Sequence, residues 1–529
     1  MFPFLVGLSV ASAATAQERP TTRPALVVFL TVDQLRPDYL ERWRDQLSGG
    51  LKRLLEQGAF IPLGVHDHAI TETAPGHAAT LSGRFPYSTG IASNRAGVNT
   101  ADAPLVGASG AGASPTRFVG TTLADWMIAA DPRSRVLSVS RKDRGAILPV
   151  GRGRHSVFWY SPAEGRFVTS TWYADSLPSW IHRFNAEDRV MKRYAGRSWE
   201  PLLDASAYPE PDSVAAESGG EDYVFPHLLP RDELRARNLV IGFPWMDELT
   251  LDLAWRGVRE LDLGAGPQTD LLAVSLSSTD AVGHRYGPDS RELHDQILRL
   301  DRALGPFLDS LVALRGAGNV IVALTSDHGM APSPEIRSTW GDNRSAIRVY
   351  RDDFDPVLVA VSTRVARSGI PPEAFTFDGQ ILEVDRAQAV GKERALLDLA
   401  RAFASSARRV RGVLRVDVID DLARADTVKD VIARRWLHMF RPGGDALVAI
   451  TLRRYGVFGH GNTATHGSPH DYDATVPIIF WGSPFVPGRV TVSARVVDIA
   501  PTLAAVLGVK PLERLDGVTL RTILRWPSP

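Results

Sequence analysis

The chain has 529 residues, of which 44% are hydrophobic and 23% are charged, a composition typical of a globular protein with a sizeable buried core. Sixty basic and sixty acidic residues give a formal net charge of zero. This balance argues against a protein dedicated to binding nucleic acid, which would need a basic face. Because the chain has no cysteine, disulfides and cofactors made from a cysteine side chain are excluded.

The N-terminus carries a short apolar stretch that ends in an Ala-x-Ala motif at Ala14 and Ala16. The stretch is too short to span a bilayer, although no Lys or Arg precedes it as in most export signals. We expect a signal peptide over residues 1–16. No later stretch is long and apolar enough to be transmembrane, so the sequence predicts a periplasmic or secreted protein.

Hydrophobic periodicity predicts strands that alternate with helices along the chain. The predicted strands cover residues 25–33, 270–280, 319–329, 412–418 and 476–481, and the predicted helices cover residues 39–57, 290–314, 392–411 and 497–507. A strand, a helix and a further strand at this spacing are typical of a parallel sheet. Residues 201–221 are rich in Pro, Ser, Gly and acidic residues, and we expect an exposed loop there.

Acidic and imidazole side chains stand where several of these predicted strands begin or end. The set comprises Asp33, Asp280, His284, Asp327, His328 and His466. In an open α/β sheet, ligands bind beyond the carboxyl ends of the strands. Asp280 and His284 are four residues apart, so one helical turn puts both on one face. Carboxylate oxygen and imidazole nitrogen together suit zinc, and the six side chains predict a site for two metals.

Thr73 is the candidate nucleophile. It lies two residues before Pro75 and Gly76, at a predicted helix N-terminus where amides and the helix dipole favour an anion. Taken alone, Thr71 and Thr73 are better explained as helix caps. A bound metal lowers the pKa of water from 15.7 to about 7 and acts on an alcohol ligand in the same sense, so the metal cluster favours the nucleophile.

These residues, in this order and spacing, resemble the metal signature of the alkaline phosphatase superfamily. Within it the chain most resembles the bacterial PafA/PhoK-type alkaline phosphatases, which use a threonine nucleophile. Asn94 lies where those enzymes place an asparagine that touches phosphate, and Lys142 and Arg144 match their Lys-x-Arg segment. The resemblance extends from about residue 25 to residue 522.

The resemblance implies a doubly wound, mostly parallel central sheet flanked by helices. We expect one such domain over residues 25–522, with insertions at about 150–260 and about 335–455. Two Zn²⁺ per chain are implied, one held by Asp280, His284 and His466 and the other by Asp33, Thr73, Asp327 and His328. Thr73 would then form a covalent phosphothreonine, and Asn94, Lys142 and Arg144 would bind the phosphate during catalysis.

Lys142 and Arg144 also distinguish between classes of substrate. A phosphate monoester keeps charged oxygens that a diester lacks, and Arg and Lys suit such oxygens. On an extended segment, residues i and i+2 face the same side, so both could reach one ligand while Asp143 points away. We therefore expect an alkaline phosphatase that acts on small phosphate monoesters. Separately, we expect the protein to be a monomer.

Three alternatives remain open from the sequence. A phosphodiesterase or nucleotide pyrophosphatase of the same superfamily shares every metal ligand. A phosphotransferase could use the same intermediate, and an inactive binding protein could keep the fold. We interpret the remaining histidines as structural or solvated, among them His66, His68, His77, His460 and His470.

Overall fold

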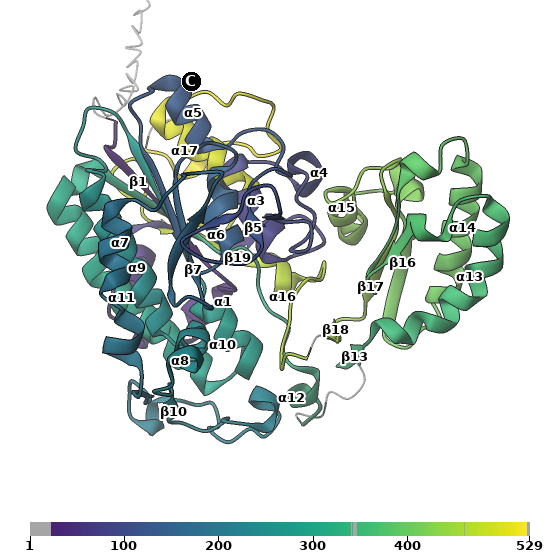
Figure 1. The fold of residues 1–529 in the computed structure, drawn as a ribbon, viewed down its shortest axis with the longest axis horizontal. Coiled ribbons are helices and arrows are strands. Elements are labelled where there is room, and N and C mark those ends of the chain that lie inside the picture. The colour runs from purple at the N-terminus through teal and green to yellow at the C-terminus, as the bar shows by residue number, and fades with distance from the viewer. Residues whose placement is uncertain (1–22, 340, 342–345, 460, 526–529) are drawn as a thin grey trace, which may run out of the picture.

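The computed structural model describes residues 23–339, 341, 346–459 and 461–525 (Figure 1). The predicted signal peptide and His460 lie outside the described residues. Among the described residues, no helix combines the length and the hydrophobicity needed to cross a membrane.

The described residues form a central eleven-stranded sheet in the order β20-β2-β19-β12-β1-β11-β6-β7-β8-β4, with β21 beside β2. Its strands are β1 (Leu26–Val32), β2 (Ala59–Val65), β4 (Leu105–Val106), β6 (Val136–Ser140), β7 (Ser156–Ser161), β8 (Arg166–Ser170), β11 (Asp270–Leu276), β12 (Val320–Thr325), β19 (Thr475–Trp481), β20 (Gly488–Arg489) and β21 (Ala494–Arg495). The five strands from β12 to β7 run parallel, whereas β19 is antiparallel to β12. The prediction of a mostly parallel sheet is confirmed.

Helices cover both faces of this sheet, because its central strands are apolar on both sides. Along β1, Val28 and Leu30 belong to one buried cluster, whereas Val27 and Phe29 belong to another. The first cluster includes residues of α2 (Gly50–Gln57), α7 (Ser179–Ala186), α9 (Trp245–Glu260), α10 (Ser278–Tyr286) and α11 (Arg291–Arg315). The second includes residues of α3 (Thr73–Ser82), α5 (Leu123–Ala130), α6 (Asp143–Ile147) and α17 (Ile499–Leu507).

The helix predicted over residues 39–57 is wrong, because this segment is broken. It forms α1 (Pro37–Arg42), a short 3-10 turn and then α2. The Asp301 carboxylate accepts hydrogen bonds from the backbone N–H groups of Ser48 and Gly49, both at 2.6 Å. A Cβ on Gly49 would lie only 2.1 Å from the Asp301 carbonyl oxygen. The close packing of this turn on α11 therefore interrupts the helix.

A second lobe, green in Figure 1, lies beside the core. Its antiparallel sheet consists of β14 (Phe375–Phe377), β15 (Ile381–Val384), β17 (Ala446–Leu452) and β16 (Val413–Val418), and α13 (Asp355–Ser368) and α14 (Glu393–Ala407) pack on it. The parallel pair β13 (Ile347–Val349) and β18 (Gly456–Phe458) lies where the chain enters and leaves the lobe. Helix α15 (Val431–Leu437) touches the core, where Arg434 pairs with Asp67 at 3.0 Å. The division into one domain with two insertions stays a prediction.

The remaining α-helices and strands of the described residues are short. They are α4 (Pro86–Thr89), α8 (Glu233–Leu239), α12 (Pro334–Thr339), α16 (Asp471–Ala474), β3 (Asn99–Thr100), β5 (Gly112–Ala113), β9 (Ser198–Trp199) and β10 (His227–Leu228). Residues 201–221 contain only short 3-10 turns, which agrees with the predicted loop. The predicted helix over residues 290–314 is α11, and the predicted terminal helix is α17.

Glu217 makes the stability of this fold depend on pH. Its side chain is buried, and burial together with the nearby carboxyls of Glu292 and Asp212 raises its pKa from 4.5 to about 9. Between these values the folded protein keeps a proton that the unfolded chain releases, so stability falls as pH rises. We expect Glu217→Gln to flatten this slope by up to about 1.4 kcal/mol per pH unit, the limit for one proton. Urea unfolding from pH 5 to 9 would test this, and parallel curves for the two proteins would contradict it.

Candidate active site

The predicted ligands meet at one edge of the central sheet. Asp33 directly follows β1, Asp280 lies in α10 just after β11, and Asp327 and His328 follow β12. The carboxyl ends of these parallel strands share an edge. His466 lies in the loop before β19, and because β19 is antiparallel to β12, its first residues lie at the same edge. The structure therefore brings together six side chains from four segments that are far apart in the sequence.

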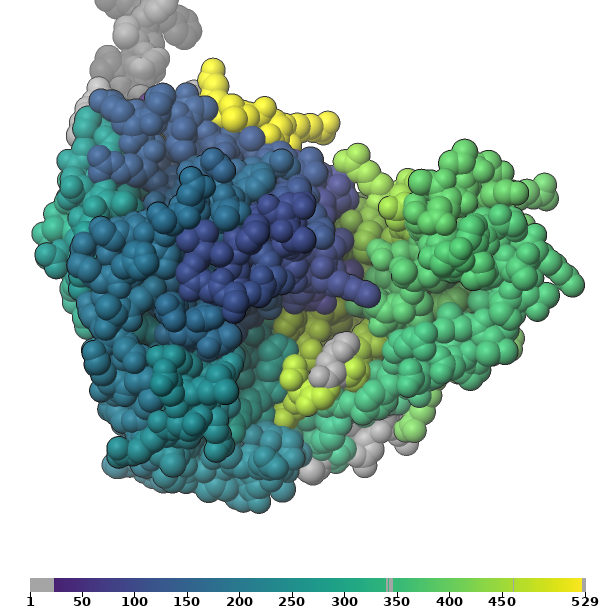
Figure 2. Space-filling view, viewed as in Figure 1, coloured from purple at the N-terminus to yellow at the C-terminus, as the bar shows by residue number. Residues whose placement is uncertain are grey.

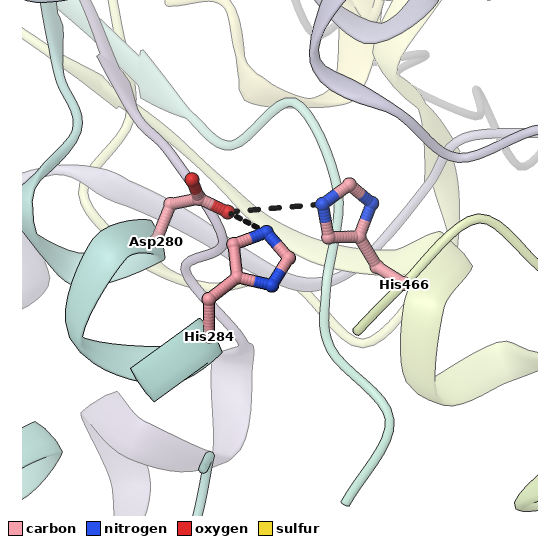
Figure 3. A group of neighbouring side chains, drawn as sticks. All are labelled: Asp280, His284 and His466. Atoms are coloured by element: carbon pink, nitrogen blue, oxygen red, sulfur yellow. Dashed lines mark ion pairs between the residues drawn. The ribbon is translucent and has the colours of Figure 1, made fainter. Parts of the chain in front are cut away.

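One group consists of Asp280, His284 and His466, shown in Figure 3. Asp280 and His284 project from one turn of α10, and His466 faces them from its loop. The Asp280 Oδ1 atom lies 3.3 Å from Nε2 of His284 and 3.7 Å from Nε2 of His466. These ligand atoms all lie within 4.8 Å of one another, which is close enough for one ion to bind all three.

A second group consists of Asp33, Asp280 and His328. The His328 Nε2 atom lies 3.4 Å from Asp33 Oδ1 and 3.6 Å from Asp327 Oδ2, so Asp327 borders this group. Asp327 is fixed through its other oxygen, which accepts a hydrogen bond from the backbone N–H of Gln34 at 3.2 Å. Asp280 thus lies between the two groups, whereas the family resemblance assigned it to one metal alone.

All three imidazoles present the same nitrogen to these carboxylates. The Nδ1 atoms of His284, His328 and His466 donate to the backbone carbonyls of Ala464, Gly329 and Thr71, at 2.9, 2.9 and 2.8 Å. A carbonyl can only accept, so each Nδ1 carries the proton and Nε2 is left with a lone pair when the ring is neutral. This backbone support is typical of histidines that bind metals.

The charges at this edge favour a bound cation. Among the described residues, Asp33 Oδ1, Asp280 Oδ1 and Asp327 Oδ2 are buried and accept no hydrogen bond. Burial, together with the charges of Asp280 and Asp327, raises the pKa of Asp33. Burial also opposes the ionisation of Asp280, but the charge of Lys142 holds its pKa well below the usual range. Unpaired carboxylate oxygens that face imidazole lone pairs fit divalent metal ions.

Burial also keeps His466 neutral. Burial and the neighbouring charges of His328 and His284 hold the pKa of His466 well below its usual value. In His284 the opposite holds: burial lowers the pKa, but the adjacent Asp280 carboxylate raises it to above its usual value. His284 must therefore release a proton before its Nε2 can bind a metal, so metal affinity should rise with pH.

Thr73 is the first residue of α3 and lies beside both groups. Its Oγ1 atom is 3.5 Å from His328 Nε2 and accepts a hydrogen bond from Lys142 Nζ at 3.1 Å. Helix α3 can approach the sheet edge this closely because residue 76 is glycine. A Cβ on Gly76 would lie 2.1 Å from the Asp327 carbonyl oxygen. The helix N-terminus, which favours an anion, therefore faces the predicted metal ligands.

Lys142 bridges the two acidic side chains that would otherwise repel each other. Its Nζ atom lies 2.6 Å from Asp33 Oδ2 and 2.7 Å from Asp280 Oδ2. Asn94 is also close to the candidate nucleophile Thr73, because its Oδ1 accepts a hydrogen bond from the backbone N–H of Ala74 at 2.9 Å. The amide group of Asn94 therefore has its Nδ2 as the remaining donor.

The extended arrangement expected for residues 142–144 is wrong. Helix α6 begins at Asp143, so Lys142 precedes the helix and Arg144 lies in its first turn. The Asp143 carboxylate accepts from the backbone N–H of Arg144 at 2.6 Å, as expected for an acidic residue in a first helical turn. The Arg144 guanidinium lies 3.6 Å from Asp143, and the structure does not bring it into contact with Thr73 or Lys142.

Three side chains that sequence reasoning did not assign to the site also contact it. His77 was expected to pack or cap; its Nδ1 is 2.9 Å from the Thr73 carbonyl and 3.1 Å from Asp327 Oδ2. Arg141 lies 3.8 Å from Asp280, and Glu72 directly precedes Thr73. The only sequence signal for Arg141 and Glu72 is that each adjoins a candidate residue.

The family follows from comparison with known proteins. The sequence profile of the family described as type I phosphodiesterase / nucleotide pyrophosphatase matches residues 27–373, which include every predicted ligand except His466. The chain belongs to this family, within the alkaline phosphatase superfamily.

Several relatives that match over nearly the whole chain are bacterial alkaline phosphatases, and one from Myroides odoratus, 31% identical over 94% of this chain, is named a calcium-transporting ATPase. Alkaline phosphatase PhoV of Synechococcus elongatus is 30% identical over 525 residues, which cover 95% of this chain and 93% of PhoV. Alkaline phosphatase PafA of Elizabethkingia meningoseptica is 29% identical, with 96% of each chain covered. The crystal structure of wild-type PafA matches with a TM-score of 0.86 at 28% identity, over 96% of this chain and 100% of the PafA chain. The predicted PafA/PhoK-type resemblance and the fold class are confirmed.

Proposed function

We propose that this protein is an exported alkaline phosphatase that uses two Zn²⁺ and hydrolyses phosphate monoesters through a covalent phosphothreonine. The observation that carries the proposal is the arrangement around Thr73. Three imidazoles present Nε2 to three buried carboxylates, and the nucleophile and Lys142 lie among them. The names of PhoV and PafA, which match over nearly the whole chain, support the same activity.

Zinc is the metal that the donor set favours. Asp280, His284 and His466 would hold one ion, and Asp33, Asp327, His328 and the Thr73 oxygen would hold the other. When bound, the ions supply the positive charge that activates an attacking oxygen and stabilises a leaving one. The mixture of carboxylate and imidazole also suits the neighbouring transition metals, so metal analysis of the purified protein is needed.

The side chains of the protein then take separate parts in the reaction. Thr73 Oγ1 attacks phosphorus and becomes esterified, and the alcohol of the substrate leaves. Lys142 already contacts Thr73 Oγ1, so its ammonium lies within reach of a phosphoryl group on that oxygen. Asn94 offers the Nδ2 donor and Arg144 a planar donor fork for the outer phosphate oxygens. Water finally hydrolyses the phosphothreonine, and two displacements give overall retention at phosphorus.

The family description keeps a phosphodiesterase as the second candidate. Both activities use the same metal ligands. The choice between monoester and diester therefore depends on the positively charged side chains that face the outer phosphate oxygens. A diester carries one negative charge fewer there, and it gains less from a buried lysine. The side chain of Lys142 is only 5% exposed, which favours the more highly charged monoester.

The experiment compares the hydrolysis of p-nitrophenyl phosphate with that of bis-p-nitrophenyl phosphate in buffer with zinc. We expect the wild-type protein to prefer the monoester. Arg144→Ala should lower kcat/KM for the monoester by about 10- to 100-fold, the value of a charged hydrogen bond, and affect the diester less. Arg154→Ala is the control, because Arg154 is exposed and bonds to the Trp172 carbonyl. Wild-type preference for the diester would support the second candidate.

We also propose that the protein is exported by its N-terminal segment and acts as a monomer. Fractionation of cells that produce the full chain, with N-terminal sequencing of the product, would test removal of residues 1–16. Light scattering of the purified protein would test the oligomeric state.

A further inference from the structure

We propose that Glu72 is a positioning residue that holds Asn94 against the nucleophile, so that the Asn94 amide is in place before phosphate binds. The inference rests on the proposed function, since it assigns a supporting role within the same site. It concerns a residue that would touch neither the metals nor the phosphate and would act through Asn94.

The contacts form a closed loop of hydrogen bonds around Thr73. Glu72 is the residue immediately before α3, and its Oε2 accepts a hydrogen bond from the backbone N–H of Asn94 at 2.6 Å. The Asn94 Oδ1 in turn accepts from the backbone N–H of Ala74 at 2.9 Å. The residues on either side of Thr73 therefore hold Asn94 at two points, one on its main chain and one on its side chain.

The segment that carries Asn94 makes few other hydrogen bonds to the rest of the protein. Residues 92–97 contain no helix or strand. In the described part of the chain, the two hydrogen bonds that join this segment to another segment are those to Glu72 and Ala74. The further bond of the Asn94 main chain is local, from Gly97 N–H at 3.2 Å. A bond to a carboxylate is stronger than one between neutral groups, so Glu72 makes the larger contribution.

The two bonds also determine what Asn94 can offer to a ligand. Because Oδ1 is occupied by Ala74, the side-chain amide is oriented, and its Nδ2 remains as the donor. A neutral donor that is already oriented loses less freedom on binding phosphate. Without Glu72, Asn94 would lose the one of its two anchors that holds its main chain, and the amide would spend part of its time away from Thr73.

The Glu72 side chain also adjoins the loop of a metal ligand, so a purely structural role must be distinguished. A Cβ placed on Gly467 would lie 3.8 Å from Glu72 Cγ. Glu72 also lines a cavity of about 40 Å³ with His466 and Gln380, which lies at the boundary with the second lobe. Figure 2 shows a recess between the core and the green lobe, with yellow-green atoms inside it. If Glu72 instead positioned the loop that carries His466, its loss would change metal binding. The effect of that loss on activity would then be independent of Asn94.

A double-mutant cycle separates the two roles. We expect Glu72→Ala to lower kcat/KM for p-nitrophenyl phosphate by about 10-fold, the value of one charge-assisted hydrogen bond. Asn94→Ala should cost at least as much, and Glu72→Ala should add nothing to it, because Glu72 acts through Asn94. Glu72→Gln keeps a carbonyl acceptor of similar shape and should recover most of the activity. Multiplicative effects of the two alanine variants, or an unimpaired Glu72→Ala variant, would overturn the proposal.

Hydrogen exchange provides a readout that does not depend on activity. In Glu72→Ala the peptide over residues 91–98 should exchange faster than in the wild-type protein, whereas β12 should not change. Glu513→Ala is the matched control, since Glu513 also accepts a backbone N–H bond, from Thr121 at 2.8 Å. It should change neither the 91–98 peptide nor the activity.

The two readouts also separate this proposal from the proposed function. If the zinc-loaded wild-type protein hydrolyses no monoester, the proposed function fails, and exchange in the 91–98 peptide still tests the positioning. If that peptide exchanges at the wild-type rate in Glu72→Ala, or if this variant binds less zinc, the positioning role is wrong even where activity falls.

Discussion

Thr73→Ala is expected to lower kcat for phosphate monoesters by roughly 10³-fold or more while both metal ions remain bound. The substitution removes the oxygen on which the covalent intermediate forms. It leaves the three imidazoles and three carboxylates in place, and alanine is a good helix former at the start of α3. Turnover of p-nitrophenyl phosphate, measured together with zinc content by mass spectrometry, would test both parts of the expectation.

A threonine on the same helix provides the control. Thr80 is also buried, and its hydroxyl donates to the His77 carbonyl at 2.7 Å, but it lies two turns from the site. Thr80→Ala should cost stability by about 1 kcal/mol and leave kcat near the wild-type value. Acid-quenched wild-type protein should carry phosphate on Thr73. If Thr73→Ala retains most of its activity, or if phosphate is found on another residue, the nucleophile is wrongly assigned.

Asp280→Ala is expected to remove at least one zinc ion per chain and to lower kcat/KM by roughly 10³-fold. Asp280 is the carboxylate common to both candidate metal groups. Its Oδ1 faces His284 and His466, and its Oδ2 faces Lys142. Removing it deprives the two histidines of their shared anionic partner. Zinc content after dialysis, and the rise in Tm on adding zinc, would measure the loss, because a ligand that binds the folded state stabilises it.

Asp247→Asn is the matched control for this variant. Asp247 is a buried carboxylate of α9, and it accepts hydrogen bonds from Ser278 N–H at 3.0 Å and Gln296 Nε2 at 2.9 Å. Burial raises its pKa to about 6, so a neutral amide is a mild replacement. The variant should retain two zinc ions. Retention of two ions by Asp280→Ala as well would show that the candidate metal groups do not bind the zinc.

The candidate ligands could be predicted from the sequence because their positions depend on the residues that adjoin them in the chain. An apolar run that ends in Asp327 and His328 predicts a buried strand and also marks the polar residues at its end. The spacing of Asp280 and His284 requires only one helical turn, which α10 supplies. The carboxyl ends of parallel strands share an edge, so the meeting of these residues follows from the fold class.

Local sequence patterns predicted the wrong secondary structure where a contact with a distant residue determines the backbone conformation. The segment from Tyr39 to Gln57 has helical periodicity, yet the Asp301 carboxylate binds the backbone N–H groups of Ser48 and Gly49, and a new helix, α2, begins at Gly50. Lys142 and Arg144 were predicted on an extended segment. In the structure, α6 begins at Asp143, so Lys142 precedes the helix and Arg144 lies in its first turn.

The amino-acid sequence by itself determined the class of fold, the identity of the candidate ligands and the position of the candidate nucleophile at a helix start. Only the tertiary structure decided how these parts are held: the carbonyls that orient each imidazole, the placement of Asp280 between two groups, and the bond from Glu72 to Asn94. The physical reason is the range of the interactions. Periodicity and spacing act within one element, whereas a hydrogen bond between residues 22 or 395 positions apart exists only after the chain has folded.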